Sequence, residues 1–84
     1  MSEYAVVIDG NLFVAEAGSR KEAWKLALAK AALMVKNEEV SDEEVYITVL
    51  RRKEAEKAGI SLLFADVLNA DVFKEYEALR RAAS

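Results

Sequence analysis

The chain has 84 residues, a net charge of −3, and apolar and charged fractions of 54% and 32%. This length and balance predict one globular domain over residues 1–84 with a small core, and they exclude a disordered chain. The absence of cysteine and histidine excludes disulfides, thiolate and imidazole chemistry, and zinc sites of the usual kind.

Membrane and nucleic-acid partners are disfavoured by the distribution of apolar and basic residues. No run of about 18 apolar residues occurs, and the N-terminus lacks the charged start and apolar core of a secretory signal. The basic clusters at residues 51–53 and 80–81 are interleaved with acids, so neither predicts a phosphate-binding surface. We expect a soluble protein, cytoplasmic if natural or recombinantly expressed if designed, with no membrane and no nucleic acid as partner.

The first segment, EYAVVIDGNLFVAEA at residues 3–17, predicts a β-hairpin. Two β-rich runs flank Asp9-Gly10-Asn11, and these residue types tolerate the positive φ angles of tight hairpin turns. Because side chains alternate between faces, the hairpin presents apolar residues on both sides. A hairpin with one face in water should not have this pattern.

Residues 18–37, GSRKEAWKLALAKAALMVKN, predict a helix. Ser19 is the expected N-cap, and Glu22 completes a capping box. The helical period places one apolar stripe toward the core. That stripe consists of Trp24, Ala27, Leu28, Ala31 and Val35. A second stripe, which a helix lying on one sheet does not need, consists of Leu26, Ala29 and Leu33.

The middle of the chain changes from acidic to β-branched. The acidic run from residue 38 predicts a solvated loop, since it lacks the alternating oxygen ligands and central glycine of a calcium loop. The run of β-branched and aromatic residues that follows predicts a strand over residues 44–52. The sequence EAEKAGI then predicts a short helical turn or a loop that ends at Gly59.

Residues 59–73, GISLLFADVLNADVF, are mostly apolar, with only Asp66 and Asp71 charged. Residues 60–68 fit a strand and a helix equally well, because periodicity cannot decide for so short a run. Asp66 lies inside this apolar stretch, so a specific polar role such as pairing with an arginine is one interpretation.

The chain closes with DVFKEYEALRRAAS, which predicts an amphipathic helix with Asp71 as its N-cap. The order of elements is a hairpin, a helix, a strand, an undecided element and a C-terminal helix. This order predicts an α+β fold of two layers, with helices against an antiparallel or mixed sheet.

Catalytic chemistry finds little support in the residues present. The serines have no histidine to activate them, and Ser19 and Ser41 are better explained as helix caps. The three glycines each lie at a break between elements, so no phosphate-binding loop is present. We therefore expect no enzyme, no cofactor and no metal.

The surplus of apolar residues is the main functional signal. A domain this small has few layers with which to cover both faces of the hairpin, the second stripe of the helix and the stretch at residues 60–73. Either helices cover both faces of the sheet, or some of this surface contacts another protein. The candidate protein-binding residues are Leu62, Leu63, Phe64, Val67, Leu68, Val72 and Phe73, followed by Leu26 and Leu33.

The whole chain resembles de novo designed proteins in style. The segments VVIDGNLFV, GSRKEAWKLALAKAAL, VSDEEVYITVLRR and YEALRRAAS combine propensity, capping and patterning consistently, as design practice demands. Cysteine, histidine and proline are also absent. The order of elements is similar to that of ubiquitin-like and immunoglobulin-binding β-grasp domains if residues 60–67 form a strand, although no motif carries their function over.

These observations favour a non-catalytic protein-binding module, de novo designed, that docks a target protein through an apolar patch. One alternative is a designed fold or a self-associating scaffold without a target. Another is a small natural inhibitor, of the kind that phages encode, acting by occlusion.

Overall fold

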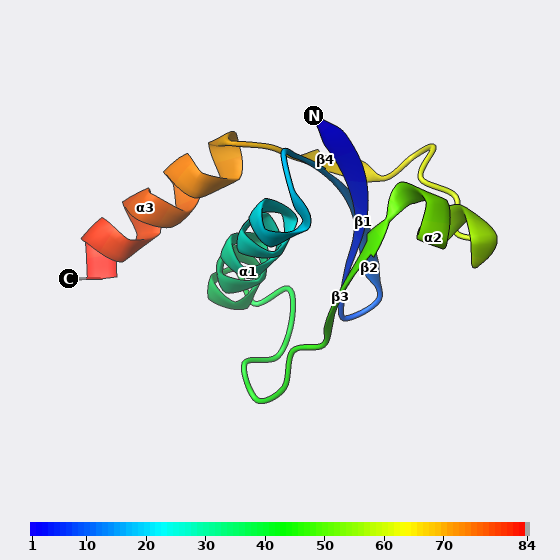
Figure 1. Cartoon of the computed structure of the whole chain (residues 1–84). Coiled ribbons are helices and arrows are strands. Elements are labelled where there is room, and N and C mark those ends of the chain that lie inside the picture. Colours follow the sequence, from blue (N-terminus) through cyan, green and yellow to red (C-terminus); the bar gives the residue numbers. More distant parts are fainter. Residues whose placement is uncertain (84) are drawn as a thin grey trace.

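A four-stranded mixed sheet with helices packed against it forms the computed structural model, which describes residues 1–83 (Figure 1). The elements in chain order are β1 (Ser2–Ile8), β2 (Asn11–Ala17), α1 (Arg20–Lys36), β3 (Ile47–Arg51), α2 (Arg52–Lys57), β4 (Asp66–Leu68) and α3 (Asp71–Ala83). The α+β class predicted from the sequence, with its hairpin, helix, further strands and C-terminal helix, is confirmed.

The strand order in the sheet is β3-β1-β2-β4. The predicted hairpin places β1 antiparallel to β2, with Ile8 opposite Asn11 across the turn. Asp9 and Gly10 both have positive φ angles, of 46° and 82°, which is the geometry of a type I′ turn. β3 pairs antiparallel with the other side of β1, and β4 pairs parallel with β2.

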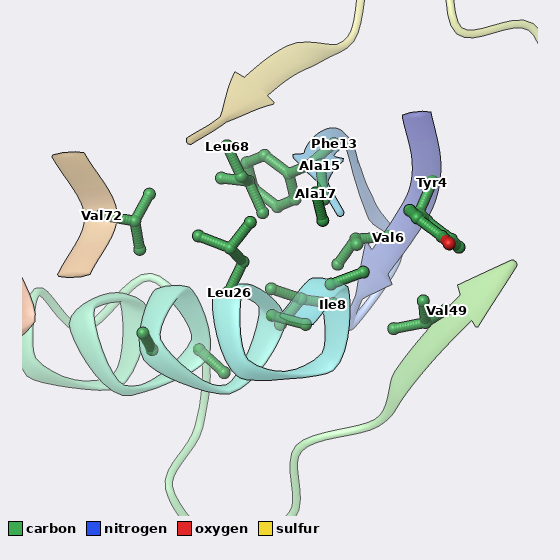
Figure 2. Packing of buried hydrophobic residues seen from close by; sticks show 14 of the residues in the cluster. Tyr4, Val6, Ile8, Phe13, Ala15, Ala17, Leu26, Val49, Leu68 and Val72 are labelled. Carbon is green, nitrogen blue, oxygen red and sulfur yellow. The ribbon is translucent and has the colours of Figure 1, made fainter. Parts of the chain in front are cut away.

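The main core lies between the sheet and α1. Every second residue of β1 points into it, and these are Tyr4, Val6 and Ile8. Figure 2 shows Val6 and Ile8 facing α1, Tyr4 at the side above Val49, and Leu26 beneath Leu68 and Phe13. The alternation that the sequence predicts therefore supplies one complete apolar face to the core.

The opposite face of the sheet is partly covered by α2 and by the irregular segment at residues 58–65, which together link β3 to β4. Ala5 and Val14, which lie on this face, are buried, and Ala55 of α2 is fully buried. The apolar character of both hairpin faces thus has a structural cause, because each face has its own cover.

The helix α1 begins as predicted, with the Ser19 hydroxyl accepting a hydrogen bond from the Glu22 N–H at 3.2 Å. The Glu22 carboxylate reaches one residue further than a capping box requires, and accepts from the Gly18 N–H at 2.9 Å. Both bonds fix the entry of the chain into the helix.

The prediction of which face of α1 meets the core is wrong for four residues. Leu26, Ala29 and Leu33 are buried, whereas Leu28 is 56% exposed. The reason is that α3 packs along α1, as Figure 1 shows, so the buried arc of α1 faces both the sheet and α3. A helix with two neighbours buries a wider arc than one that lies on a single sheet.

Two boundaries differ from the prediction in the second half of the chain. The strand expected over residues 44–52 begins only at Ile47. The C-terminal helix includes Asp71 as its first residue, so Asp71 is not its N-cap. The side chain of Asn69 instead accepts a hydrogen bond from the Asp71 N–H at 2.9 Å.

The undecided stretch at residues 60–68 is neither one strand nor one helix. Residues 60–65 are irregular, and only Asp66–Leu68 form a strand. The strand over residues 60–67 on which the similarity to β-grasp domains depends is therefore not formed.

Candidate protein-binding surface

The nine apolar residues predicted to bind a protein fall into three groups by exposure. Four of them are buried in the main core, namely Leu26, Leu33, Leu68 and Val72. Two others, Leu62 and Phe73, are half-buried. The remaining three form what we call the 63–67 patch: Leu63 (77% exposed), Phe64 (93%) and Val67 (53%).

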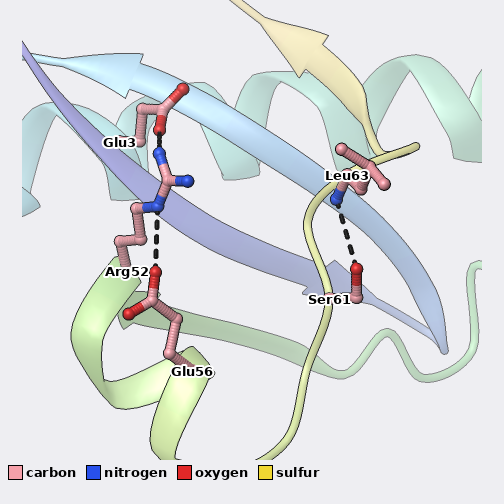
Figure 3. Close-up of polar contacts among 5 residues, drawn as sticks. All are labelled: Glu3, Arg52, Glu56, Ser61 and Leu63. Atoms are coloured by element: carbon pink, nitrogen blue, oxygen red, sulfur yellow. Dashed lines mark hydrogen bonds and ion pairs between the residues drawn. The ribbon is translucent and has the colours of Figure 1, made fainter.

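The patch is carried by the segment that crosses the sheet from α2 to β4. Figure 3 shows this segment passing over the face of the sheet opposite α1, with Leu63 pointing away from the strands. The Ser61 hydroxyl accepts a long hydrogen bond from the Leu63 N–H, at 3.4 Å. The Ala65 N–H donates to the Leu62 carbonyl at 3.3 Å, which turns the chain back toward β4.

Val67 extends the patch onto the sheet itself. It lies opposite Val14 in the parallel pair of β4 and β2, and Val14 in turn lies opposite Ala5. Directly paired residues share one face of a sheet, so these three side chains form a row on the face opposite α1. Val67 is the exposed end of that row, because the cover supplied by residues 58–65 does not extend over it.

A polar cluster lies at the other end of this face. Arg52 forms ion pairs with Glu3 and with Glu56, and joins the start of β1 to α2 (Figure 3). The hydrogen bond with Glu56 and the charge of Glu3 raise the pKa of Arg52 above its already high ordinary value. All three side chains are exposed, so the cluster contributes little to stability.

Asp66 is exposed and makes no ion pair with another residue in the described chain. Asp66 and Lys30 line one pocket together with Phe13. The Lys30 ammonium group lies 5.5 Å from the centre of the Phe13 ring. The pairing of Asp66 with an arginine, one interpretation of the sequence, is not formed.

Within residues 1–83, no buried side-chain nitrogen or oxygen lacks a hydrogen-bond partner. Over the same range, no group of three or more acidic, histidine or cysteine residues could hold a metal ion. None of the helices described is long and apolar enough to cross a membrane.

Among the described residues, three large apolar side chains outside the patch are also exposed. They are Met1 at the N-terminus (96%), Tyr46 beside the hairpin turn (66%) and Leu28 on α1 (56%). The exposure of Leu28 could have been predicted only with the knowledge that α3 packs against α1 and changes which face of α1 is buried.

The fold and the patch define a small α+β domain with an exposed apolar surface at one edge of its sheet. In comparisons with known proteins, no family model matches the chain, and neither a curated protein nor a solved structure matches it significantly.

Proposed function

We propose that this protein is a non-catalytic binding module that docks a target protein through the 63–67 patch. The observation that carries the proposal is the near-complete exposure of Phe64 beside Leu63 on a segment otherwise turned toward the sheet. Leaving large apolar side chains in water costs roughly 25 cal/mol for each Å² that could be buried. A partner that covers them recovers this free energy.

The composition of the patch fits the centre of a protein interface. Aromatic residues are enriched there, and charged residues are depleted. Between Gly59 and Phe73 the chain carries only Asp66 and Asp71 as charges, so an apolar centre is bordered by acids. The half-buried side chains of Leu12 and Leu62 would enlarge the contact area.

The proposal does not depend on how the sequence arose. A de novo designed origin stays a prediction from composition and patterning. Glu38 counts against it, since it has a positive φ angle of 59° at a non-glycine residue, whereas the positive φ of Asp9 belongs to an Asp-Gly type I′ turn, which designed hairpins use. Idealised backbones avoid such positions except by intent.

The test compares the wild-type protein with the double variant Leu63→Ser/Phe64→Ser. Both are immobilised and screened against a displayed library of protein domains and fragments, and recovered clones are purified for titration. We expect clones that bind the wild type at least about tenfold more tightly than the variant, a factor typical of losing one interface hot spot. The variant Leu28→Ser removes an exposed apolar side chain elsewhere and should leave binding unchanged.

Light scattering during size-exclusion chromatography, over a wide concentration range, gives the complementary result. We expect a monomer. A stable dimer that the double variant converts to monomer would mean that the patch serves self-association, and the proposal of a separate target would then be wrong. The absence of any clone that discriminates the wild type from the double variant would also contradict it.

A further inference from the structure

The two edges of the sheet differ in how their backbone groups are covered. At the β3 edge, Arg20 donates a hydrogen bond from its Nη2 to the Val49 carbonyl at 2.9 Å. The Glu54 carboxylate accepts from the Arg51 N–H at 2.8 Å, and its Oε1 lies 3.5 Å from Nη1 of Arg20. Side chains therefore already form hydrogen bonds with the backbone groups of β3 that a further strand would need.

The direction of the backbone groups at the β4 edge follows from the hairpin. Ile8 and Asn11 flank a two-residue turn, so they form a hydrogen-bonded pair, and pairs of this kind alternate along the strands. The N–H and C=O of Val14 consequently point toward β4. In the parallel register, Val14 lies opposite Val67. The N–H and C=O of Val14 therefore form their hydrogen bonds with the residues on either side of Val67. This leaves the N–H and C=O of Val67 pointing away from the sheet.

No side chain in residues 1–83 covers the backbone of Val67, in contrast to the β3 edge. Asp66, which precedes Val67, and Asn69, two residues after it, are also exposed. The edge thus combines an outward-facing N–H and C=O with the apolar side chains of the 63–67 patch. An exposed edge of this kind is a template for an added strand.

The charges along this edge indicate what the added strand should carry. Asp66 is exposed and makes no ion pair in the described chain, although Lys30 lines the same pocket, whereas Asp71 is already paired with Lys74 at 3.8 Å. An unpaired acid directly beside an open edge favours a partner segment with lysine or arginine opposite it. A second copy of this chain would instead bring a second Asp66 to the diagonal position, about 7–8 Å away in an antiparallel pair centred on Val67.

We propose that an extended segment of a partner protein adds to the sheet as a strand alongside β4. The N–H and C=O of Val67 form its central hydrogen bonds, an apolar side chain of the segment packs on Phe64 and Val67, and a basic side chain lies beside Asp66. This inference rests on the proposed function and deepens it by naming the class of partner and the way it binds.

The experiment uses a displayed library of random linear peptides, selected on the full wild-type chain. Selected peptides are titrated against Val67→Pro and Val67→Thr. Proline removes the outward N–H and keeps apolar surface, and it is tolerated on an edge strand where that N–H faces solvent. Threonine keeps the N–H and the β-branched shape. Two-dimensional NMR spectra establish that both variants fold.

If the partner segment adds as a strand, the selected peptides should have alternating apolar residues and at least one lysine or arginine. Their affinity should fall at least about tenfold in Val67→Pro, because a buried carbonyl of the peptide loses its donor, and less in Val67→Thr. If Val67→Pro fails to fold, peptides N-methylated at alternate residues provide the same comparison. Only the register whose N–H groups face β4 should then lose affinity.

Three results would overturn strand addition. Equal losses in Val67→Pro and Val67→Thr, or equal affinity of both N-methylated registers, would mean that the side chains alone bind, which leaves the proposed function standing. A dimer that Val67→Pro dissociates would identify a second copy as the occupant. A failure to select any peptide would rule out extended segments, while the domain and fragment screen separately decides the proposed function.

Discussion

Leu26 and Phe64 are both large apolar side chains, yet Leu26 is 1% exposed and Phe64 is 93% exposed. Leu26 lies where α1 meets the sheet, beneath Leu68 and Phe13 (Figure 2). Phe64 lies on the segment that crosses the other face. The contribution of each side chain to stability should differ accordingly, because only a buried side chain leaves a cavity when it is truncated.

We expect Leu26→Ala to lower the free energy of unfolding by about 2–5 kcal/mol, the range for truncating a buried leucine. Phe64→Ser should change it by no more than about 0.5 kcal/mol, as for other exposed positions. Urea denaturation followed by circular dichroism measures both. A loss above about 2 kcal/mol in Phe64→Ser would mean that Phe64 packs within the protein, since a loss of that size requires a defined structural cause.

Tyr46 offers a pH-dependent test of a surface contact. Its hydroxyl donates a hydrogen bond to the Glu44 carboxylate at 2.5 Å. This bond, with smaller effects of desolvation and of Asp9, raises the pKa of Tyr46 above its ordinary value. A raised pKa in the folded state means that the contact stabilises the protein below the ordinary tyrosine pKa of about 10 and is lost at higher pH.

Ultraviolet titration of the tyrosine phenolate measures this effect. In the background Tyr4→Phe/Tyr76→Phe, only Tyr46 titrates. We expect its pKa to lie above that of the unfolded chain and to fall toward it in Glu44→Gln, whose neutral amide no longer favours the protonated phenol. An unchanged pKa in Glu44→Gln would exclude the hydrogen bond as the main cause.

At the scale of elements, the sequence predicts the strands and helices that are specified by residues close to them in the chain. The turn residues Asp9 and Gly10 specify the hairpin, and Ser19 with Glu22 specifies the start of α1. The strand β4 has three residues, and what defines it is pairing with β2, which lies far away in the chain. Residues 60–68 therefore could not be assigned from their own periodicity.

The patch could be predicted only in part, for a related reason. The sequence indicates a surplus of apolar surface, and three of the nine candidate residues are strongly exposed. Which apolar residues are covered depends on where α3 lies, and nothing local in α1 encodes this. Leu33, for example, is buried on the side of α1 that was expected to face away from the core.

The β3 edge provides a prediction at this same scale. Arg20→Ala frees the Val49 carbonyl and releases Glu54 from its ion pair. We expect a small loss of stability, about 1 kcal/mol or less, because the ion pair is half exposed. We also expect increased self-association through the uncovered edge. Sedimentation velocity at rising concentration measures the association.

The matched control for the β3 edge is Lys21→Ala, which removes a neighbouring exposed cation of α1 without uncovering β3. It should leave the protein monomeric. If both variants associate equally, the loss of one positive charge explains the association, and Arg20 does not protect the edge.

At the scale of the whole molecule, the sheet is covered unequally on its two faces. One face meets α1, a helix of 17 residues, and the other meets α2, which has six residues, together with an irregular segment. α3 lies outside α1 and fully buries only Val72 (Figure 1). Such an arrangement predicts that the outer elements open more readily than the central ones, since they bury less apolar surface.

Amide hydrogen exchange under native conditions tests this order. We expect the slowest exchange in β1, which is paired on both sides, and in the middle of α1. Amides of α3 and α2 should exchange faster, because each of these helices buries only one of its own side chains. Equal protection of α3 and β1 would mean that the molecule opens only as one unit. The face that carries the 63–67 patch would then be as rigid as the core, and a partner would meet a preformed surface.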